Sequence, residues 1–67
     1  MKELIFLVED CAEGGYIAKA LGESIFTQGE TWQELQIQIR DAVDCHFEEN
    51  KPQIIRLHYV RDEVIAA

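Results

Sequence analysis

The first thirty residues alternate short apolar segments with polar breaks, and the apolar segments have the length and composition of strands. Residues 4–8 are Leu-Ile-Phe-Leu-Val, and residues 16–21 follow a glycine pair. β-Branched and aromatic residues are enriched in strands, and a glycine-containing break between two such segments predicts a hairpin. Residues 24–27 form a third, shorter segment. We therefore predict strands over 4–8, 16–21 and 24–27, with residues 28–30 as a turn.

A helix is predicted to begin after Thr31. Thr31 and Glu34 have the Thr-x-x-Glu spacing of a capping box, in which each side chain binds the backbone N–H of the other residue. Apolar residues then recur every three or four positions and form one stripe: Trp32, Leu35, Ile39, Ala42, Val43 and Phe47. Ile37 is an apolar exception outside the stripe. We predict the helix end at Asn50, because asparagine tolerates a left-handed cap and Pro52 disfavours a helical predecessor.

Residues 53–60 alternate apolar with mostly polar side chains and are predicted as a fourth strand. Residues 61–67 fit either a short edge strand or an irregular end. The order β-β-β-α-β predicts an α+β fold, in which one helix packs on one face of a single antiparallel-rich sheet. The other face of the first strand is also apolar and needs a second chain to cover it. The candidate interface residues are Ile5, Leu7, Trp32 and Ile37.

The length of 67 residues predicts one domain, residues 1–67, that is marginal as a monomer. Its two cysteines, Cys11 and Cys45, are far apart and accompany no secretory signal. The apolar segment 4–8 is too short for a signal-peptide core or a membrane span. We therefore expect a reducing, cytoplasmic location in which both cysteines are thiols. Assembly into a homo-oligomer is then the expected source of additional stability.

The charge balance bears on the class of partner. Thirteen acidic and six basic residues give a net charge of −7, and the basic residues do not cluster. Nucleic-acid binding requires a basic surface that neutralises phosphates, so direct binding of nucleic acid is not expected. An acidic surface suits a basic protein partner, although it is also an ordinary property of soluble proteins.

Two short motifs, in this order, resemble those of the HicB-like antitoxin family. The first is similar to the family's Gly-Gly-Tyr hairpin, and the second to its turn and helix start, with glutamate at the usual aspartate position and leucine at a usual alanine position. The motif residues are Gly14, Gly15, Tyr16, Thr27, Gln28, Gly29, Glu30, Thr31 and Glu34. The resemblance covers roughly residues 3–50.

The resemblance implies a degenerate ribonuclease-H-like fold and a protein-binding function without catalysis. HicB antitoxins mask a small basic ribonuclease toxin, HicA, so the resemblance implies a toxin–antitoxin role with a basic partner. Many members also carry a C-terminal DNA-binding segment, for which this sequence leaves no room after its fourth strand. The alternative function is a self-associating structural or regulatory domain without a toxin.

Candidate catalytic and metal-binding residues form only weak patterns. Glu9, Asp10 and Glu13 are the one tight carboxylate cluster, but they lie in a predicted turn without a basic substrate groove. Cys45 and His46 do not have the spacing of zinc ligands. We expect a buried or half-buried thiol at Cys45 and a helix-end histidine at His46. The sequence thus predicts no enzyme, no cofactor and no metal site. A metal-dependent nuclease or a thiol-dependent enzyme, acting through Glu9, Asp10 or Cys45, is the third hypothesis.

Overall fold

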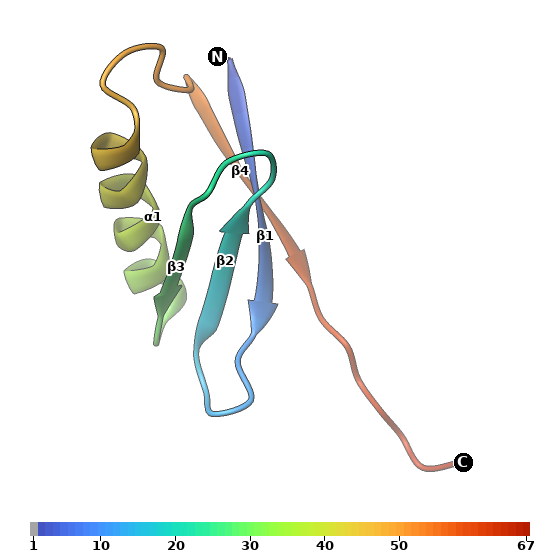
Figure 1. The fold of residues 1–67 in the computed structure, drawn as a ribbon. Coiled ribbons are helices and arrows are strands. Elements are labelled where there is room, and N and C mark those ends of the chain that lie inside the picture. The colour runs from blue at the N-terminus through green and yellow to red at the C-terminus, as the bar shows by residue number, and fades with distance from the viewer. Residues whose placement is uncertain (1) are drawn as a thin grey trace.

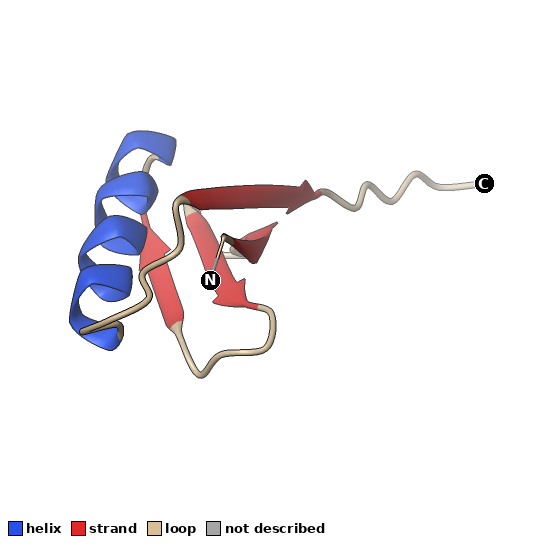
Figure 2. Cartoon of the chain, turned by 90° about the horizontal axis from the view of Figure 1, so that it is seen from above, coloured by secondary structure: helices blue, strands red, loops and turns tan. Residues whose placement is uncertain are grey.

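The computed structural model describes residues 2–67 and has a four-stranded sheet with one helix on one face (Figures 1 and 2). The elements are β1 (Glu3–Asp10), β2 (Tyr16–Ala20), β3 (Phe26–Gly29), α1 (Trp32–His46) and β4 (Ile54–Val60). The strand order is β3-β2-β1-β4. The β1–β2 and β2–β3 pairs are antiparallel, whereas β4 runs parallel to β1. The predicted α+β fold with an antiparallel-rich sheet and one packed helix is confirmed.

The core lies between α1 and the sheet. Leu35, Ile39 and Val43 of the predicted stripe are buried, while Trp32, Ala42 and Phe47 are partly buried against them. The sheet contributes the other buried apolar side chains: Leu4, Phe6, Val8, Ala18, Ala20 and Ile25. Each large side chain removed from water contributes about 1.5–3 kcal/mol. The stripe of the helix was therefore predicted correctly, including its exception at Ile37, which is exposed.

Two glycines allow β2, β3 and α1 to approach one another closely. Gly29 ends β3, and a Cβ atom there would lie 2.6 Å from the backbone nitrogen of Leu35 in α1. Gly15 has a φ of +83°, and a Cβ atom on it would lie 2.6 Å from the carbonyl oxygen of Gly29. L side chains rarely adopt such a φ, and no side chain fits in such gaps. The two glycine motifs therefore meet in space.

The third strand lies two residues later than predicted. It begins at Phe26 and includes Gln28 and Gly29, so the prediction of a turn over 28–30 was wrong. Register explains the difference, because Gly29 pairs with Tyr16 and Gln28 pairs with Ile17 on β2. Pairing across the sheet determines where a strand ends, whereas glycine content alone predicted a turn.

The helix ends at His46, four residues before the predicted end at Asn50. Phe47 has extended backbone angles, φ −106° and ψ 112°, and its N–H donates to the Val43 carbonyl at 3.0 Å. Its side chain packs against the core, so the chain leaves the helix there. Asn50 does adopt the expected left-handed conformation, at φ 57°, but within the loop that leads to β4.

β4 continues into residues 61–67, here called the tail, which has no regular secondary structure. The tail runs away from the sheet in line with β4 (Figures 1 and 2). Val64 is 93% and Ile65 81% exposed. Two apolar side chains thus project into solvent at the end of an extended segment.

Candidate functional site

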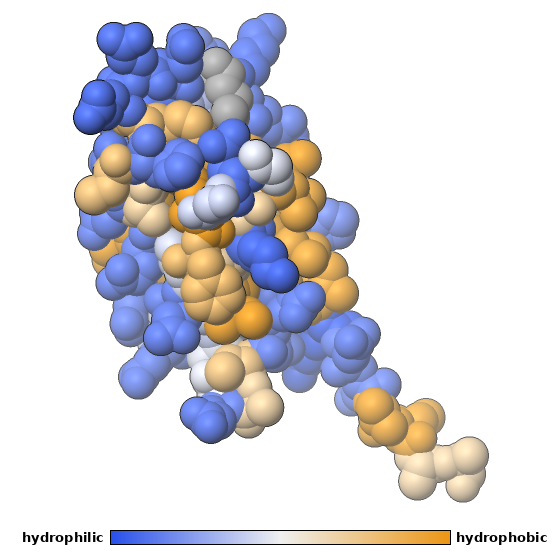
Figure 3. Space-filling view, viewed as in Figure 1, coloured by the Kyte–Doolittle hydropathy of each residue, from blue (hydrophilic) through white to orange (hydrophobic). Residues whose placement is uncertain are grey.

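The sheet face opposite α1 is uncovered within residues 2–67. Ile5 and Leu7 point to this face because they alternate with the buried Leu4, Phe6 and Val8. Strand pairing places further apolar residues on the same face: Ile17, Phe26, Ile54 and Val60. These six residues define the open face. Apolar surface interrupts the hydrophilic exterior over the sheet and reappears near the end of the tail (Figure 3).

An aromatic cluster lies on the opposite side of the sheet, at the end where α1 begins. Tyr16 from β2, Trp32 from α1 and Tyr59 from β4 pack edge to face. Their ring centroids are 5.2 to 5.8 Å apart. Such contacts contribute about 0.5–1.5 kcal/mol each beyond burial. Tyr16 and Trp32 are half-buried and Tyr59 is exposed, so the cluster joins the core to the surface.

A carboxylate holds the exposed tyrosine of this cluster. The Tyr59 hydroxyl donates to Asp10 Oδ1 at 2.6 Å. This hydrogen bond, together with desolvation, raises the pKa of Tyr59 above its ordinary value, because ionisation would place two negative charges side by side. Arg61 Nε lies 3.6 Å from Asp10 Oδ2 and acts in the opposite direction. The pair connects the end of β1 to the end of β4.

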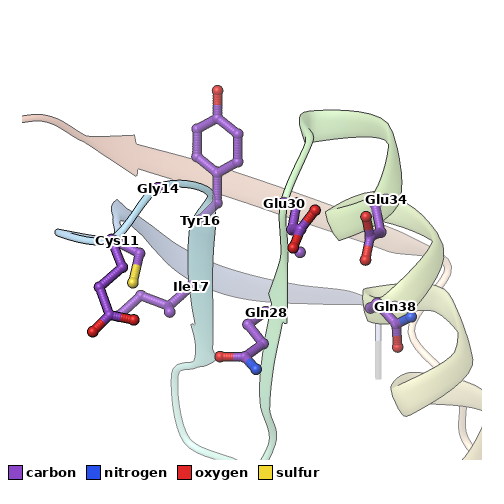
Figure 4. A pocket seen from close by; sticks show the side chains of 10 residues that line it. Cys11, Gly14, Tyr16, Ile17, Gln28, Glu30, Glu34 and Gln38 are labelled. Atoms are coloured by element: carbon purple, nitrogen blue, oxygen red, sulfur yellow. The ribbon is translucent and has the colours of Figure 1, made fainter.

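A polar hollow of about 520 Å³ lies beside the turn between β1 and β2 (Figure 4). Glu13, Glu30 and Glu34 contribute carboxylates to its lining, and Cys11 and Gln38 lie at opposite sides. No group of three or more His, Cys, Asp or Glu side chains is placed to hold a metal ion among residues 2–67. The hollow therefore has the chemistry of a solvated acidic rim.

The four predicted interface residues do not form one surface. Ile5 and Leu7 lie half-buried on the open face. Trp32 belongs to the aromatic cluster on the other side of the sheet. Ile37 is 55% exposed on α1. Trp32 and Ile37 also point in different directions, because Trp32 belongs to the apolar stripe that faces the core and Ile37 lies outside that stripe.

Most residues of the sequence motif have structural roles. Thr31 is the N-cap of α1, and its side chain accepts from the Glu34 N–H at 3.0 Å, as the capping box predicted. Thr27 is buried between the sheet and the helix. Tyr16 differs from them because its ring reaches the aromatic cluster. The sequence analysis did not identify Tyr59 as a partner of Tyr16. The alternation of Ile55, Leu57 and Tyr59 along the fourth strand was a signal that all three lie on the core side of the sheet.

The remaining chemically reactive candidates are separated from one another. Cys45 is exposed, so the expectation of a buried or half-buried thiol was wrong. It lies one residue before the end of α1, outside the buried stripe. His46 ends the helix as expected, and its Nε2 lies 3.0 Å from Glu23 Oε1. Glu9 and Asp10 end β1 instead of forming the predicted turn, and Glu13 is exposed in the hairpin.

Comparison with known proteins places the chain among close relatives. It is 48% identical over 65 residues to a UPF0150 protein of Thermotoga maritima, covering 97% of this chain and 93% of the relative. The chain belongs to the UPF0150 family. A UPF0150 protein of Archaeoglobus fulgidus is 54% identical over 48 residues, which is 72% of this chain and 71% of the relative. No family model and no solved structure matches the chain. No helix of this UPF0150 chain within residues 2–67 is long and apolar enough to cross a membrane.

Proposed function

We propose that this UPF0150 protein is a non-catalytic protein-binding module that masks a small basic protein, in the manner of HicB antitoxins and HicA-type toxins. The observation that carries the proposal is the open face, which leaves apolar residues of all four strands uncovered on a small domain. Such a surface marks an interaction site when it is large for the molecule. The element order also agrees with the degenerate ribonuclease-H-like fold that the resemblance implies.

Charge favours a basic partner for this part of the molecule. Residues 1–50 hold eleven of the thirteen acidic residues but only three of the six basic ones. Glu9 is exposed on β1 and shares the side of Ile5 and Leu7. Lys19, Arg56 and His58 lie on the same side, so the attraction comes from the net negative charge of the molecule, which steers a basic protein toward it and disfavours acidic competitors.

The test is capture of the partner from native cells. The tagged chain is purified, and the co-purifying proteins are identified by mass spectrometry. We expect a small basic protein in a stoichiometric amount. Leu7→Lys on the open face should lose that protein, because the substitution adds a cation where a basic partner docks. Ile37→Lys on α1 is the matched control and should retain it. A chain that returns only with copies of itself would contradict the proposal.

A second function, self-association without a toxin, is favoured by a different observation. β4 is an edge strand of seven residues and has no neighbour on its outer side among residues 2–67. Exposed edges are sites at which another chain adds a strand. This function predicts an assembly of copies in the absence of any other protein.

A further inference from the structure

The outer edge of β4 has free backbone hydrogen-bonding groups. The Ile54 N–H donates to the Lys2 carbonyl at 2.9 Å, on the β1 side. Successive N–H groups of a strand point to alternate sides. Those of Ile55, Leu57 and Tyr59 therefore point away from β1, where no strand lies within the described residues 2–67. This edge is long, apolar and ready to pair with another strand.

The edge differs in charge from the rest of the molecule. Residues 51–61 contain no acidic residue, but they contain Lys51, Arg56, Arg61 and His58. A basic partner is therefore not attracted to this edge, whereas an acidic extended segment is. The chain itself has such a segment directly after β4, where Asp62 and Glu63 precede the exposed Val64 and Ile65.

The tail does not reach the edge of its own chain. It leaves β4 in line with the strand and away from the sheet (Figure 2). To pair with its own β4 it would have to reverse within a tight turn, and residues 61–67 contain Asp62 but no glycine. The favoured two-residue hairpin turns use glycine, alone or after asparagine or aspartate. A second copy of the chain can receive the tail without any reversal.

We infer that β4 pairs antiparallel with β4 of a second copy about a twofold axis through Leu57, and that each tail crosses the other copy. This inference deepens the self-association function and is independent of toxin masking. In this register Ile55 lies opposite Tyr59 of the second copy, and Ile54 lies opposite its Val60. Aromatic and β-branched pairs of this kind stabilise neighbouring strands. Glu63 lies opposite Lys51 of the second copy.

The neighbouring registers are less favourable. An axis through Arg56 would place the two Arg56 side chains opposite each other and Lys51 opposite Arg61. An axis through His58 would place Asp62 opposite Ile54. Like charges opposite each other destabilise a strand pair, and an acid beside an apolar residue loses hydration without gaining a partner. The axis through Leu57 pairs Ile54 with Val60, Ile55 with Tyr59 and Lys51 with Glu63, and its least favourable pairs are Arg56 with His58 and Pro52 with Asp62. It alone among the three places an acid opposite a lysine or arginine without placing two arginine or lysine side chains opposite each other.

Existing contacts at the edge do not oppose this pairing. Lys51 Nζ lies 2.7 Å from Asp44 Oδ1, but both side chains are more than half exposed. Exposed ion pairs contribute about 0–1 kcal/mol and exchange readily. A groove of about 230 Å³ between α1 and β4 has Ile39, Ile55 and Leu57 in its lining. Tyr59 of the second copy, opposite Ile55, would lie at the rim of this groove and cover apolar surface.

The first test is the mass of the purified chain, measured by sedimentation equilibrium over a range of concentrations without other proteins. We expect a reversible dimer of twice 7.7 kDa. Ile54→Lys should raise the dissociation constant about tenfold, because by symmetry each dimer contains the altered pair twice. Ile37→Lys is the control: Ile37 is 55% and Ile54 54% exposed, but Ile37 lies on α1. It should leave the dissociation constant unchanged.

The second test addresses the register. Lys51→Glu and Glu63→Lys should each weaken the dimer several-fold, and the double variant should restore it. Weakening without restoration would overturn the register. A monomer at every concentration would overturn the dimer, as would a dimer that is weakened by Leu7→Lys and not by Ile54→Lys. A monomeric chain that still captures a basic protein would overturn this inference alone and leave toxin masking standing.

Discussion

The two edges of the same sheet have opposite structures. β3 forms one edge with four residues, and α1 packs so closely beside it that Gly29 has no room for a side chain. β4 forms the other edge with seven residues, has no neighbour on its outer side within residues 2–67, and continues into an extended tail. Long exposed edges invite strand addition, and short covered ones do not. The comparison indicates that the short β3 edge lies close against the helix at Gly29, whereas the long β4 edge is available for association.

Charge differs between the same two regions. The acidic residues lie mostly before residue 51, whereas β4 and the residues that flank it are basic up to Arg61. One small chain therefore offers an acidic body with an open apolar face and a basic edge. These surfaces suit two different partners, a basic protein and a second copy, and they meet at Ile54 and Val60, which belong both to the open face and to the β4 edge.

Adding a side chain at the close contact of the β3 edge should have the largest effect. Gly29→Ala should destabilise the fold by about 3 kcal/mol, because the new Cβ would lie 2.6 and 2.8 Å from the backbone of Leu35. Chemical denaturation followed by circular dichroism measures the loss. Gly22→Ala is the control, since nothing lies within 4 Å of its added Cβ and its cost comes only from the φ of +88°. Equal losses of stability in the two variants would show that the contact between Gly29 and Leu35 leaves room for a side chain.

A smaller loss of stability is expected at the start of α1, the helix that lies against this edge. Thr31→Ala should cost about 1 kcal/mol, because the Glu34 N–H loses its hydrogen-bond acceptor at 3.0 Å. Thr31→Ser should retain nearly all of the stability, since serine supplies the same oxygen. The measurement is the denaturant midpoint at constant slope. If serine and alanine were equally destabilising, lost packing of the methyl group would be the cause instead of the cap.

Local signals in the sequence predicted the helix beside the β3 edge well. The capping box located Thr31, and the apolar stripe identified Leu35, Ile39 and Val43 as core. The prediction failed where tertiary contacts decide. Phe47 leaves the helix to pack on the core, and the pairing of Gly29 with Tyr16 extends β3 into the predicted turn. Neither contact can be recognised from the neighbouring residues in the sequence, because its partner lies far along the chain.

The candidate site was less predictable than the fold. Alternation along the first strand indicated Ile5 and Leu7, and the structure places both on the open face. The aromatic cluster joins Tyr16, Trp32 and Tyr59 from three elements, and the parallel pairing of β4 with β1 brings them together. Sequence spacing does not reveal such a pairing, because Tyr16 and Tyr59 become neighbours only once the connection through α1 has brought β4 beside β1.

At the open edge, the tail should matter for association and not for the fold. Removal of residues 62–67 should change the free energy of unfolding by less than about 0.5 kcal/mol in dilute solution, because Val64 and Ile65 contact little of their own chain. At high concentration the same deletion should abolish the concentration dependence of the unfolding midpoint, which a dimer imposes by mass action. A dilute-solution loss of several kcal/mol would instead place the tail within the fold of the single chain.

The smallest effect is expected where the two regions meet, at Asp10 of β1 and Tyr59 of β4. Asp10→Asn should lower the pKa of Tyr59 toward the ordinary tyrosine value, because the amide accepts the hydroxyl proton without a negative charge. Tyrosinate absorbance against pH reports this in a Tyr16→Phe background, where Tyr59 is the only tyrosine. Asp44→Asn on α1 is the control and should leave that titration unchanged.

The sign of the accompanying stability change follows from the direction of the shift. The pKa of Tyr59 is higher in the folded chain than in the unfolded one. The stabilisation is therefore complete below the ordinary tyrosine pKa and disappears as the pH rises through the raised value of the folded state. Asp10→Asn should flatten this alkaline decline, while the chain with Asp10 should retain it. An unchanged decline would mean that the hydrogen bond between Asp10 and Tyr59 does not form in solution, and that β4 is held by its backbone pairing and by the packing of Ile55, Leu57 and Tyr59.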